Sequence, residues 1–304
     1  MTIQSEKNQS IEGLQVWKVI GVFALVLVAV QVAVSFFGIG VNYLMRQVNA
    51  GDNVRVFFGS TISRAGMIAA TLWICSPVIR KVFSTEPRHL LFPLESRWNK
   101  DLIAGLIIGF CTMIIIFLLM LLTGWLSLQG LALAGQPPLA WLRAIWLALL
   151  INLTAAISEE VLFRGVLLTG MKQAWDANGA IFISSVIFAA SHVVVSSASQ
   201  SRWLEFIPLL ALPGLLLGWA YVRTGNLWLA ASLHFFWNLL QDDLFNLPGR
   251  SATDSLFGFA TTQSGPAWFT GTSFGLETGL AGVLAVLLAA SGVWYYTKMM
   301  HNQK

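Results

Sequence analysis

Eight long apolar runs occupy most of this 304-residue sequence, and they decide what the chain can fold into. An apolar stretch of about 20 residues has the length of an α-helix that crosses a bilayer. Charged residues make up only 11% of the chain, whereas a soluble domain carries about 25%. This pattern excludes a soluble globular enzyme, a disordered chain and an ordinary nucleic-acid-binding protein. The runs cover residues 17–44, 61–82, 102–126, 139–168, 179–195, 204–222, 226–240 and 279–296.

The runs predict an all-α membrane protein of about eight transmembrane helices, forming a single polytopic domain over residues 1–304. The first run is too long for a secretory signal, whose apolar core has about 7–15 residues, so we expect it to remain as a span. The later runs are short and need tilting or burial among other helices. The connection over residues 241–276 is rich in Gly, Ser, Thr and Phe, and we expect a solvated connector, with a cap, gate or re-entrant segment as alternatives.

Lysine and arginine in the loops predict the orientation, because cytoplasmic loops carry the excess of positive charge. A cytoplasmic N-terminus places twelve of the 18 basic residues inside and six outside, which favours both termini in the cytoplasm. The inside residues are Lys7, Lys18, Arg80, Lys81, Arg88, Arg97, Lys100, Arg164, Lys172, Arg223, Lys298 and Lys304. The outside residues are Arg46, Arg55, Arg64, Arg143, Arg202 and Arg250.

Two adjacent glutamates, Glu159 and Glu160, lie within the fourth apolar run. A charge at the centre of a bilayer costs about 2.5–3.5 kcal/mol on insertion scales, so this pair needs a compensating function. Arg164 follows Glu160 by four residues and lies on the same helix face, which predicts an ion pair. Glu159 points about 100° away and has no such partner. We therefore predict a supporting role for Glu160 and Arg164, and a chemical role, that of a general base, for Glu159.

Two of the four histidines also lie inside apolar segments. His192 ends the sequence FAASH, and His234 begins HFFWN, with Asn238 on the same helix face four residues later. Glu159 precedes Trp175, near the middle of a predicted turn, by 16 residues, and His192 follows it by 17. In an antiparallel helical hairpin both side chains then lie about 25 Å from the turn and can face each other. Chain order alone places His234 nearer the opposite helix ends, unless a helix there is broken or tilted. Asp242 and Asp243 follow this motif, and we interpret them as a hydrated helix end.

These motifs resemble those of a membrane protease family. EEVLFR at residues 159–164 fits EExxxR, FAASH at 188–192 fits FxxxH, and HFFWN at 234–238 fits HxxxN. In this order, on successive apolar segments, they resemble the CAAX-protease and bacteriocin-processing family, also called CPBP or Abi. The Ras-converting CAAX prenyl endopeptidase is its eukaryotic relative. The resemblance covers about residues 139–240 and implies an intramembrane endopeptidase whose catalytic cavity lies among the helices.

The resemblance also implies a role for each motif residue. Glu159 corresponds to the base that activates a water molecule, and His192 to the histidine that shares this water. His234 and Asn238 correspond to the pair that stabilises the oxyanion, while Glu160 and Arg164 correspond to the supporting pair. No cofactor is implied, and the substrate is a peptide or protein, with a prenylated C-terminus as one candidate. The distribution of the family implies a bacterial inner membrane, with the endoplasmic reticulum as the alternative.

Three alternatives remain open at this point. A zinc site could use Glu159, Glu160, His192 and His234, because two histidines and a carboxylate form a known catalytic zinc set. The sequence lacks HExxH and Arg164 competes for Glu160, so we favour metal-free hydrolysis. The other two alternatives are a transporter with a Glu/His proton relay, and a non-enzymatic bacteriocin-immunity or scaffold protein.

Overall fold

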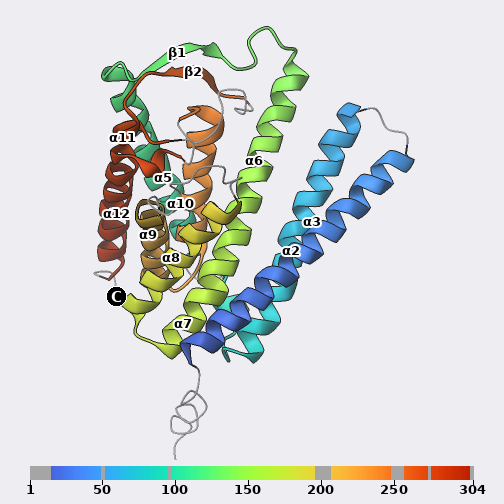
Figure 1. Ribbon diagram of the computed structural model, residues 1–304, viewed down its shortest axis with the longest axis vertical. Coiled ribbons are helices and arrows are strands. Elements are labelled where there is room, and N and C mark those ends of the chain that lie inside the picture. The colour runs from blue at the N-terminus through green and yellow to red at the C-terminus, as the bar shows by residue number, and fades with distance from the viewer. Residues whose placement is uncertain are drawn as a thin grey trace, which may run out of the picture.

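The computed structural model of the chain describes residues 15–48, 52–94, 97–195, 207–247, 257–272 and 275–301. It is a bundle of long helices with a small two-stranded sheet at one end (Figure 1). The long helices are α2 (Val16–Gln47), α3 (Asp52–Lys81), α5 (Trp98–Leu122), α6 (Pro138–Glu160), α8 (Ala177–Val195), α9 (Ile207–Thr224), α10 (Trp228–Asn238) and α12 (Leu280–His301). The shorter elements are α4 (Pro87–Leu90), β1 (Leu126–Leu131), η1 (Val161–Leu168), α7 (Thr169–Ala174), η3 (Leu239–Leu244), β2 (Phe259–Gln263), α11 (Ala267–Thr270) and η4 (Leu276–Thr278).

Within the described residues, five helices are long and apolar enough to cross a membrane, so the chain is an integral membrane protein of the all-α class. Their bounds are Val16–Gln47, Phe57–Lys81, Trp98–Leu122, Pro138–Ala174 and Leu280–Met300. Each of the eight predicted apolar runs is mainly helical, although the end of run 102–126 leads into β1 at Leu126 and residues 204–206 lie outside the described residues. The apolar parts of α8 and α9, Ala177–His192 and Leu209–Thr224, and the 11-residue α10 are shorter than a typical span of about 20 residues, so a total of eight spans stays a prediction.

The start of the first described helix and the end of the last described helix lie on the same side of the bundle (Figure 1). Helix α2 begins, and α12 ends, toward the side where α7 leads into α8, whereas the sheet lies at the other end (Figure 1). Lys18 at the start of α2 and Lys298 near the end of α12 therefore lie on the same side of the bundle. Both lysines were predicted to be among the inside residues, so their position on one side agrees with that prediction. The assignment of this side to the cytoplasm stays a prediction.

The sheet is the main departure from the predicted helices. Strand β1 pairs antiparallel with β2, from Leu126 opposite Gln263 to Leu131 opposite Phe259, with an irregularity between Leu128 and Gly130. The connection that we expected to be a solvated connector, residues 241–276, contains β2, α11 and the start of η4. In the described part, that expectation is wrong, because this connection forms a structured cap.

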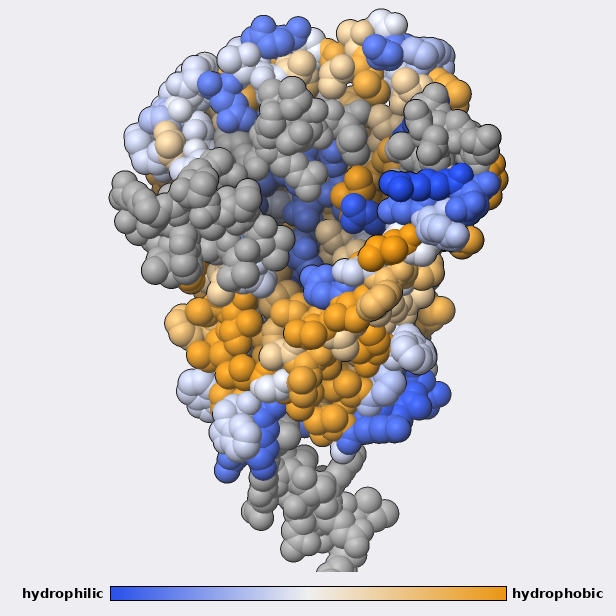
Figure 2. Space-filling model, turned by 45° about the vertical axis from the view of Figure 1, so that its right-hand side comes forward, coloured by the Kyte–Doolittle hydropathy of each residue, from blue (hydrophilic) through white to orange (hydrophobic). Residues whose placement is uncertain are grey.

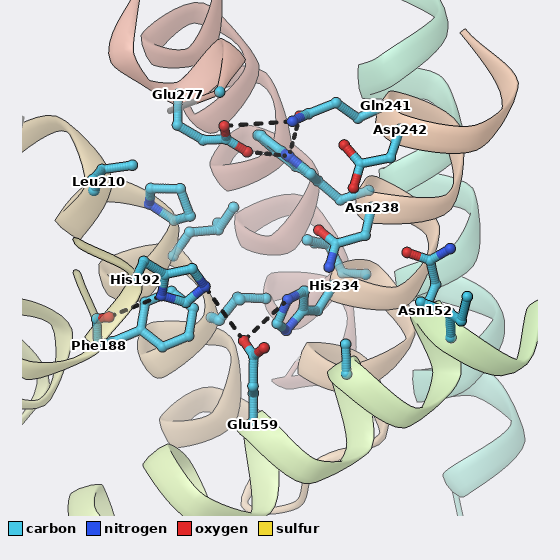
Figure 3. Close-up of a pocket in the computed structure, with 18 residues that line it drawn as sticks. Asn152, Glu159, Phe188, His192, Leu210, His234, Asn238, Gln241, Asp242 and Glu277 are labelled. Atoms are coloured by element: carbon cyan, nitrogen blue, oxygen red, sulfur yellow. Dashed lines mark hydrogen bonds and ion pairs between the residues drawn. The ribbon is translucent and has the colours of Figure 1, made fainter. Parts of the chain in front are cut away.

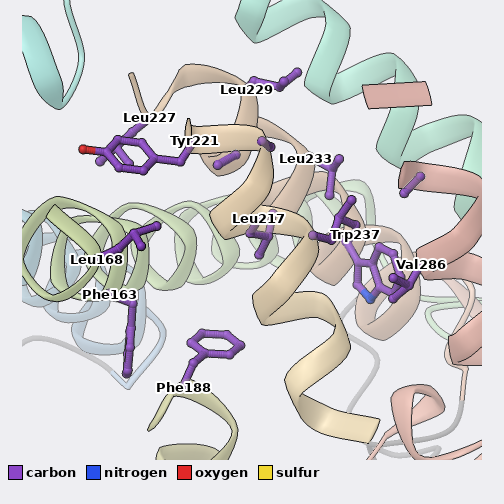
Figure 4. Packing of buried hydrophobic residues seen from close by; sticks show 14 of the residues in the cluster. Phe163, Leu168, Phe188, Leu217, Tyr221, Leu227, Leu229, Leu233, Trp237 and Val286 are labelled. Carbon is purple, nitrogen blue, oxygen red and sulfur yellow. The ribbon is translucent and has the colours of Figure 1, made fainter. Parts of the chain in front are cut away.

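Helix α10, which provides two of the predicted catalytic residues, packs closely along α5. Glycines allow this approach: a Cβ on Gly105 would come within 2.6 Å of the Leu229 carbonyl oxygen, and one on Gly109 within 3.1 Å of Phe236 Cβ. At its start, Leu227 N donates to Leu91 O at 2.9 Å, which fixes the turn before α10 against the segment that precedes α5. The neighbouring core contains Leu217, Leu229, Leu233 and Trp237 from α9 and α10, packed together (Figure 4).

Two of the three helices that contain the predicted catalytic motifs change from α to π geometry, one within EExxxR and the other directly after HxxxN. Residues 138–174 form one continuous helix, whose segment η1 begins one residue after Glu160 and is buried along its whole length. Segment η3 follows Asn238 in the same way. A π-helical segment is wider than an α-helix and is frequent at functional sites. The sequence patterns did not predict either segment.

Candidate active site

A cavity of about 380 Å³ lies among α6, α8, α9, α10 and the two segments η3 and η4. Figure 2 shows this face hollowed, with hydrophilic residues inside the hollow and a hydrophobic surface below it. One side of the cavity is apolar, with Phe188, Leu210, Pro213 and Leu217 among its residues. Four predicted catalytic residues line it: Glu159, His192, His234 and Asn238.

Glu159 points between the two histidines (Figure 3). Its Oε2 lies 3.7 Å from Nε2 of His192 and 3.8 Å from Nε2 of His234. These distances are too long for direct hydrogen bonds and suit groups that share a small molecule between them. Glu159 lies well inside the 37-residue helix 138–174, far from either end of it. The predicted approach of Glu159 and His192 across the hairpin is confirmed.

In each of the two imidazole rings, Nδ1 forms a hydrogen bond with another residue, and Nε2 points toward Glu159. His192 Nδ1 lies 2.9 Å from the carbonyl oxygen of Phe188, and a carbonyl can only accept, so this nitrogen is the donor. His234 Nδ1 lies 2.9 Å from Oε1 of Glu160. His234 is only 8% exposed, whereas His192 is 44% exposed. Chain order alone placed His234 near the opposite helix ends, away from Glu159. In the structure the His234 ring instead lies beside both glutamates.

Glu160 and Arg164 form the predicted ion pair. Arg164 Nη1 donates to Glu160 Oε1 at 2.8 Å, and both side chains are buried. Arg164 Nη2 also donates to the Gly214 carbonyl oxygen at 3.2 Å, which joins helix 138–174 to α9. The sequence predicted this pair but not that the same Glu160 oxygen also holds His234. The predicted supporting pair thus orients one of the two predicted catalytic rings.

Phe188, the first residue of the FxxxH motif, lies between the supporting pair and the histidines. The Arg164 guanidinium carbon lies 4.6 Å from the Phe188 ring centre, within the range of a cation–π interaction. The ring centres of Phe188 and His192 are 4.4 Å apart, and those of Phe188 and His234 are 6.3 Å apart. An aromatic residue at this position therefore packs both imidazoles in place.

The far wall of the cavity is polar and is formed by Asn238, Gln241, Asp242 and Glu277 (Figure 3). Gln241 and Glu277 were not predicted from the sequence, although the acidic residue just before the last apolar run was a usable signal. The prediction of a hydrated Asp243 is wrong, because this residue is fully buried. Asn152 Nδ2 donates to the carboxylate of Asp243 at 2.6 Å, so this pair connects α6 to η3 beside the cavity.

The zinc alternative can be compared with the geometry of the donors. Glu160 is already bound by Arg164 and His234, which leaves Glu159 and the two Nε2 atoms. Ligand atoms bound to one tetrahedral zinc lie about 3.3 Å apart, which is shorter than the 3.7 and 3.8 Å separations observed here. Among the described residues, no group of three His, Cys, Asp or Glu side chains is arranged to hold a metal ion.

Comparison with known proteins identifies the region around the site. A family model described as type II CAAX prenyl endopeptidase, Rce1-like, matches residues 141–240. The uncharacterized protein YpbD of Bacillus subtilis (strain 168) is 38% identical over 93 residues, which are 31% of this chain and 42% of YpbD. The match thus spans less than half of that relative. No solved structure matches the chain.

The family match contains all seven motif residues and ends before Gln241 and Glu277. The seven are Glu159, Glu160, Arg164, Phe188, His192, His234 and Asn238. The resemblance predicted from the motifs is therefore confirmed for this region. Residues 141–240, which contribute the Glu159 side of the cavity, are similar to the Rce1-like type II CAAX prenyl endopeptidase family.

Proposed function

We propose that this protein is an intramembrane endopeptidase that hydrolyses a peptide bond with a water molecule activated by Glu159 and His192. The observation that carries the proposal is the convergence of Glu159 Oε2 with Nε2 of both His192 and His234 inside a cavity of a membrane protein. The family match to prenyl endopeptidases over the same residues supports a protease.

In the first step, a water molecule lies between Glu159 and His192. Glu159 removes one of its protons, and His192 Nε2, whose Nδ1 is occupied by Phe188 O, accepts a hydrogen bond from the other. The water oxygen attacks the carbonyl carbon of the peptide bond, and the carbonyl oxygen becomes an oxyanion. General base catalysis of this kind contributes about 10²–10⁴-fold to the rate.

The developing oxyanion is stabilised from α10. The Asn238 amide and His234 lie on one face of this helix and both line the cavity. For this role the His234 ring must hold a proton on Nε2 as well as on Nδ1, the nitrogen that lies against Glu160. Losing one such donor costs about 10²–10³ in rate in a known hydrolase. The intermediate then collapses: the C–N bond breaks, and the leaving nitrogen takes the proton that Glu159 holds.

We propose a peptide or protein substrate, with a prenylated C-terminus as one candidate, no metal cofactor, and a bacterial inner membrane with both termini in the cytoplasm. The test uses purified protein in detergent and a quenched prenyl-CAAX peptide. Wild type and Glu159→Gln are compared, each with and without a zinc chelator. Glutamine keeps the shape of the side chain and removes its ability to accept the proton.

Cleavage by the wild type, its loss in Glu159→Gln and indifference to the chelator would support the full proposal. Cleavage that the chelator abolishes and zinc restores would replace the metal-free mechanism by the zinc mechanism. Cleavage that Glu159→Gln leaves unchanged would contradict the role of this glutamate. A protein that cleaves neither this peptide nor any membrane protein would favour the immunity or scaffold alternative.

A further inference from the structure

We propose that Glu277 is a specificity-determining residue that receives a positively charged side chain of the substrate peptide. The proposal rests on the function proposed above, because it concerns the far wall of the same cavity. It assigns the substrate class more narrowly: a segment with a lysine or arginine close to the bond that is cleaved.

The local backbone conformation positions Glu277 in the cavity wall. It lies in the short 3₁₀ segment η4, just before α12, and faces the cavity from the side opposite Glu159 (Figure 3). Gly275, two residues earlier, has φ +122°, a conformation that favours glycine, and a Cβ there would collide with the Glu277 carboxylate. The glycine therefore provides the space into which this carboxylate folds back.

Two side chains from the helix of the HxxxN motif fix the carboxylate. Trp237 Nε1 donates to Glu277 Oε1 at 3.0 Å, and Gln241 Nε2 donates to Oε2 at 3.4 Å. Trp237 Nε1 also donates to Gln241 Oε1 at 2.9 Å, so the three side chains form one connected group. Trp237 and Gln241 are four residues apart and lie on the face that also presents His234 and Asn238 to the cavity. Glu277 thus has a defined position relative to the proposed oxyanion site.

The negative charge of Glu277 favours a cationic substrate side chain over a neutral or acidic one. Its two hydrogen-bond donors are neutral, so they orient the carboxylate without neutralising it. Among the described residues that line the cavity there is no lysine or arginine, while Asp242 is a further carboxylate on the same wall. In a partly enclosed site, such a wall attracts a cationic side chain through charge-assisted hydrogen bonds and repels a free carboxylate. The substrate segment beside this wall is therefore expected to be basic.

The family match provides no reason to attribute this wall to all related proteases. It ends at residue 240, whereas Gln241 and Glu277 lie beyond it. The water-activating side of the cavity falls within the matched region and the charged side falls outside it. We therefore assign the preference for a basic residue to this chain.

The test measures binding, so that it does not depend on cleavage. Full-length protein in lipid nanodiscs is titrated with two short fluorescent peptides that are identical except for one position, which is lysine in one and acetyl-lysine in the other. The position is moved along the peptide in successive pairs. Wild type is compared with Glu277→Gln, with Glu277→Asp, which keeps the charge, and with Glu86→Gln, which removes an exposed glutamate outside the cavity.

We expect the wild type and Glu86→Gln to bind the lysine peptide about tenfold more tightly at one position, as for one charge-assisted hydrogen bond. Glu277→Gln should lose this ratio, and Glu277→Asp should retain part of it, which separates lost charge from misfolding. Equal affinity for both peptides in the wild type, including no detectable binding of either, would overturn the proposal. So would a ratio that survives in Glu277→Gln. Binding with this preference but without cleavage would contradict the protease function alone.

Discussion

His234 Nδ1 lies 2.9 Å from Oε1 of Glu160, the oxygen that also accepts a hydrogen bond from Arg164 at 2.8 Å. The second glutamate of the adjacent pair therefore connects a buried cation on its own helix with the His234 ring on α10, for which we propose a catalytic role. The first glutamate remains directed into the cavity. The two neighbouring glutamates therefore have different roles. Glu160 orients His234, and we propose that Glu159 activates a water molecule.

Removing Glu160 should damage both folding and activity. In Glu160→Ala the buried Arg164 charge loses its carboxylate, and breaking a buried ion pair in this way costs about 3–5 kcal/mol. We expect less folded protein and a lower thermal midpoint in detergent, and lower cleavage per folded molecule because His234 loses its anchor. Thermal unfolding and peptide cleavage measure the two effects. Glu86→Ala, at an exposed glutamate, is the control, and a Glu160→Ala protein that is normal in both assays would refute the supporting role.

Phe188 should be important for the orientation of the catalytic rings. Phe188→Leu removes the ring that packs against Arg164 and His192, a cation–π contact that is worth about 2 kcal/mol when desolvated. We expect a moderate fall in thermal stability and a larger fall in kcat than in substrate binding. The matched control is Phe182→Leu on the same helix, where the side chain is 57% exposed. Equal effects of the two substitutions on cleavage would contradict this role.

The close packing of α5 and α10 should depend on Gly105. In Gly105→Ala the new methyl group would meet the Leu229 carbonyl oxygen and the Ser232 hydroxyl, and it would push α10 away from α5. Overpacking of this kind costs about 1–3 kcal/mol. We expect a lower thermal midpoint together with reduced cleavage, because α10 contains His234 and Asn238.

Gly21→Ala on α2 provides the control for this prediction, since a Cβ at Gly21 has no atom within 4 Å. It should leave both quantities near the wild-type values. A Gly105→Ala protein as stable as Gly21→Ala would show that the two helices are not in such close contact.

Much of the fold and most of the site follow from the sequence. The apolar runs predict where each long helix lies, because the helix is the form in which a single segment can satisfy its backbone polar groups in lipid. The four-residue spacing from Glu160 to Arg164 predicts their ion pair, since i and i+4 side chains share a face of a helix. The nearly equal numbers of residues that separate Glu159 and His192 from Trp175, 16 and 17, predict that the two side chains meet, and they do.

The remaining features depend on tertiary contacts that have no local sequence signal. The π-helical segments after Glu160 and Asn238 continue directly from α-helices, and neither VLFRGVLL nor LLQDDL contains a proline that would mark a change of geometry. The position of Asp243 after a helix is typical of a hydrated charge, yet Asn152, 91 residues away, donates to it in the interior. Glu277 becomes part of the site only because η4 folds back beside Trp237 and Gln241. Such contacts between distant segments cannot be read from spacing within one segment.

The central claim is that Glu159 enables this protein to hydrolyse peptide bonds in a membrane. The most direct measurement compares peptide termini, identified by mass spectrometry, in membranes that contain either the wild type or Glu159→Gln at equal abundance. The substrate does not have to be identified before the measurement, because every new terminus is detected. We predict a set of termini that is present with the wild type and absent with Glu159→Gln. Identical sets of termini in the two membranes, with both proteins folded, would contradict the claim.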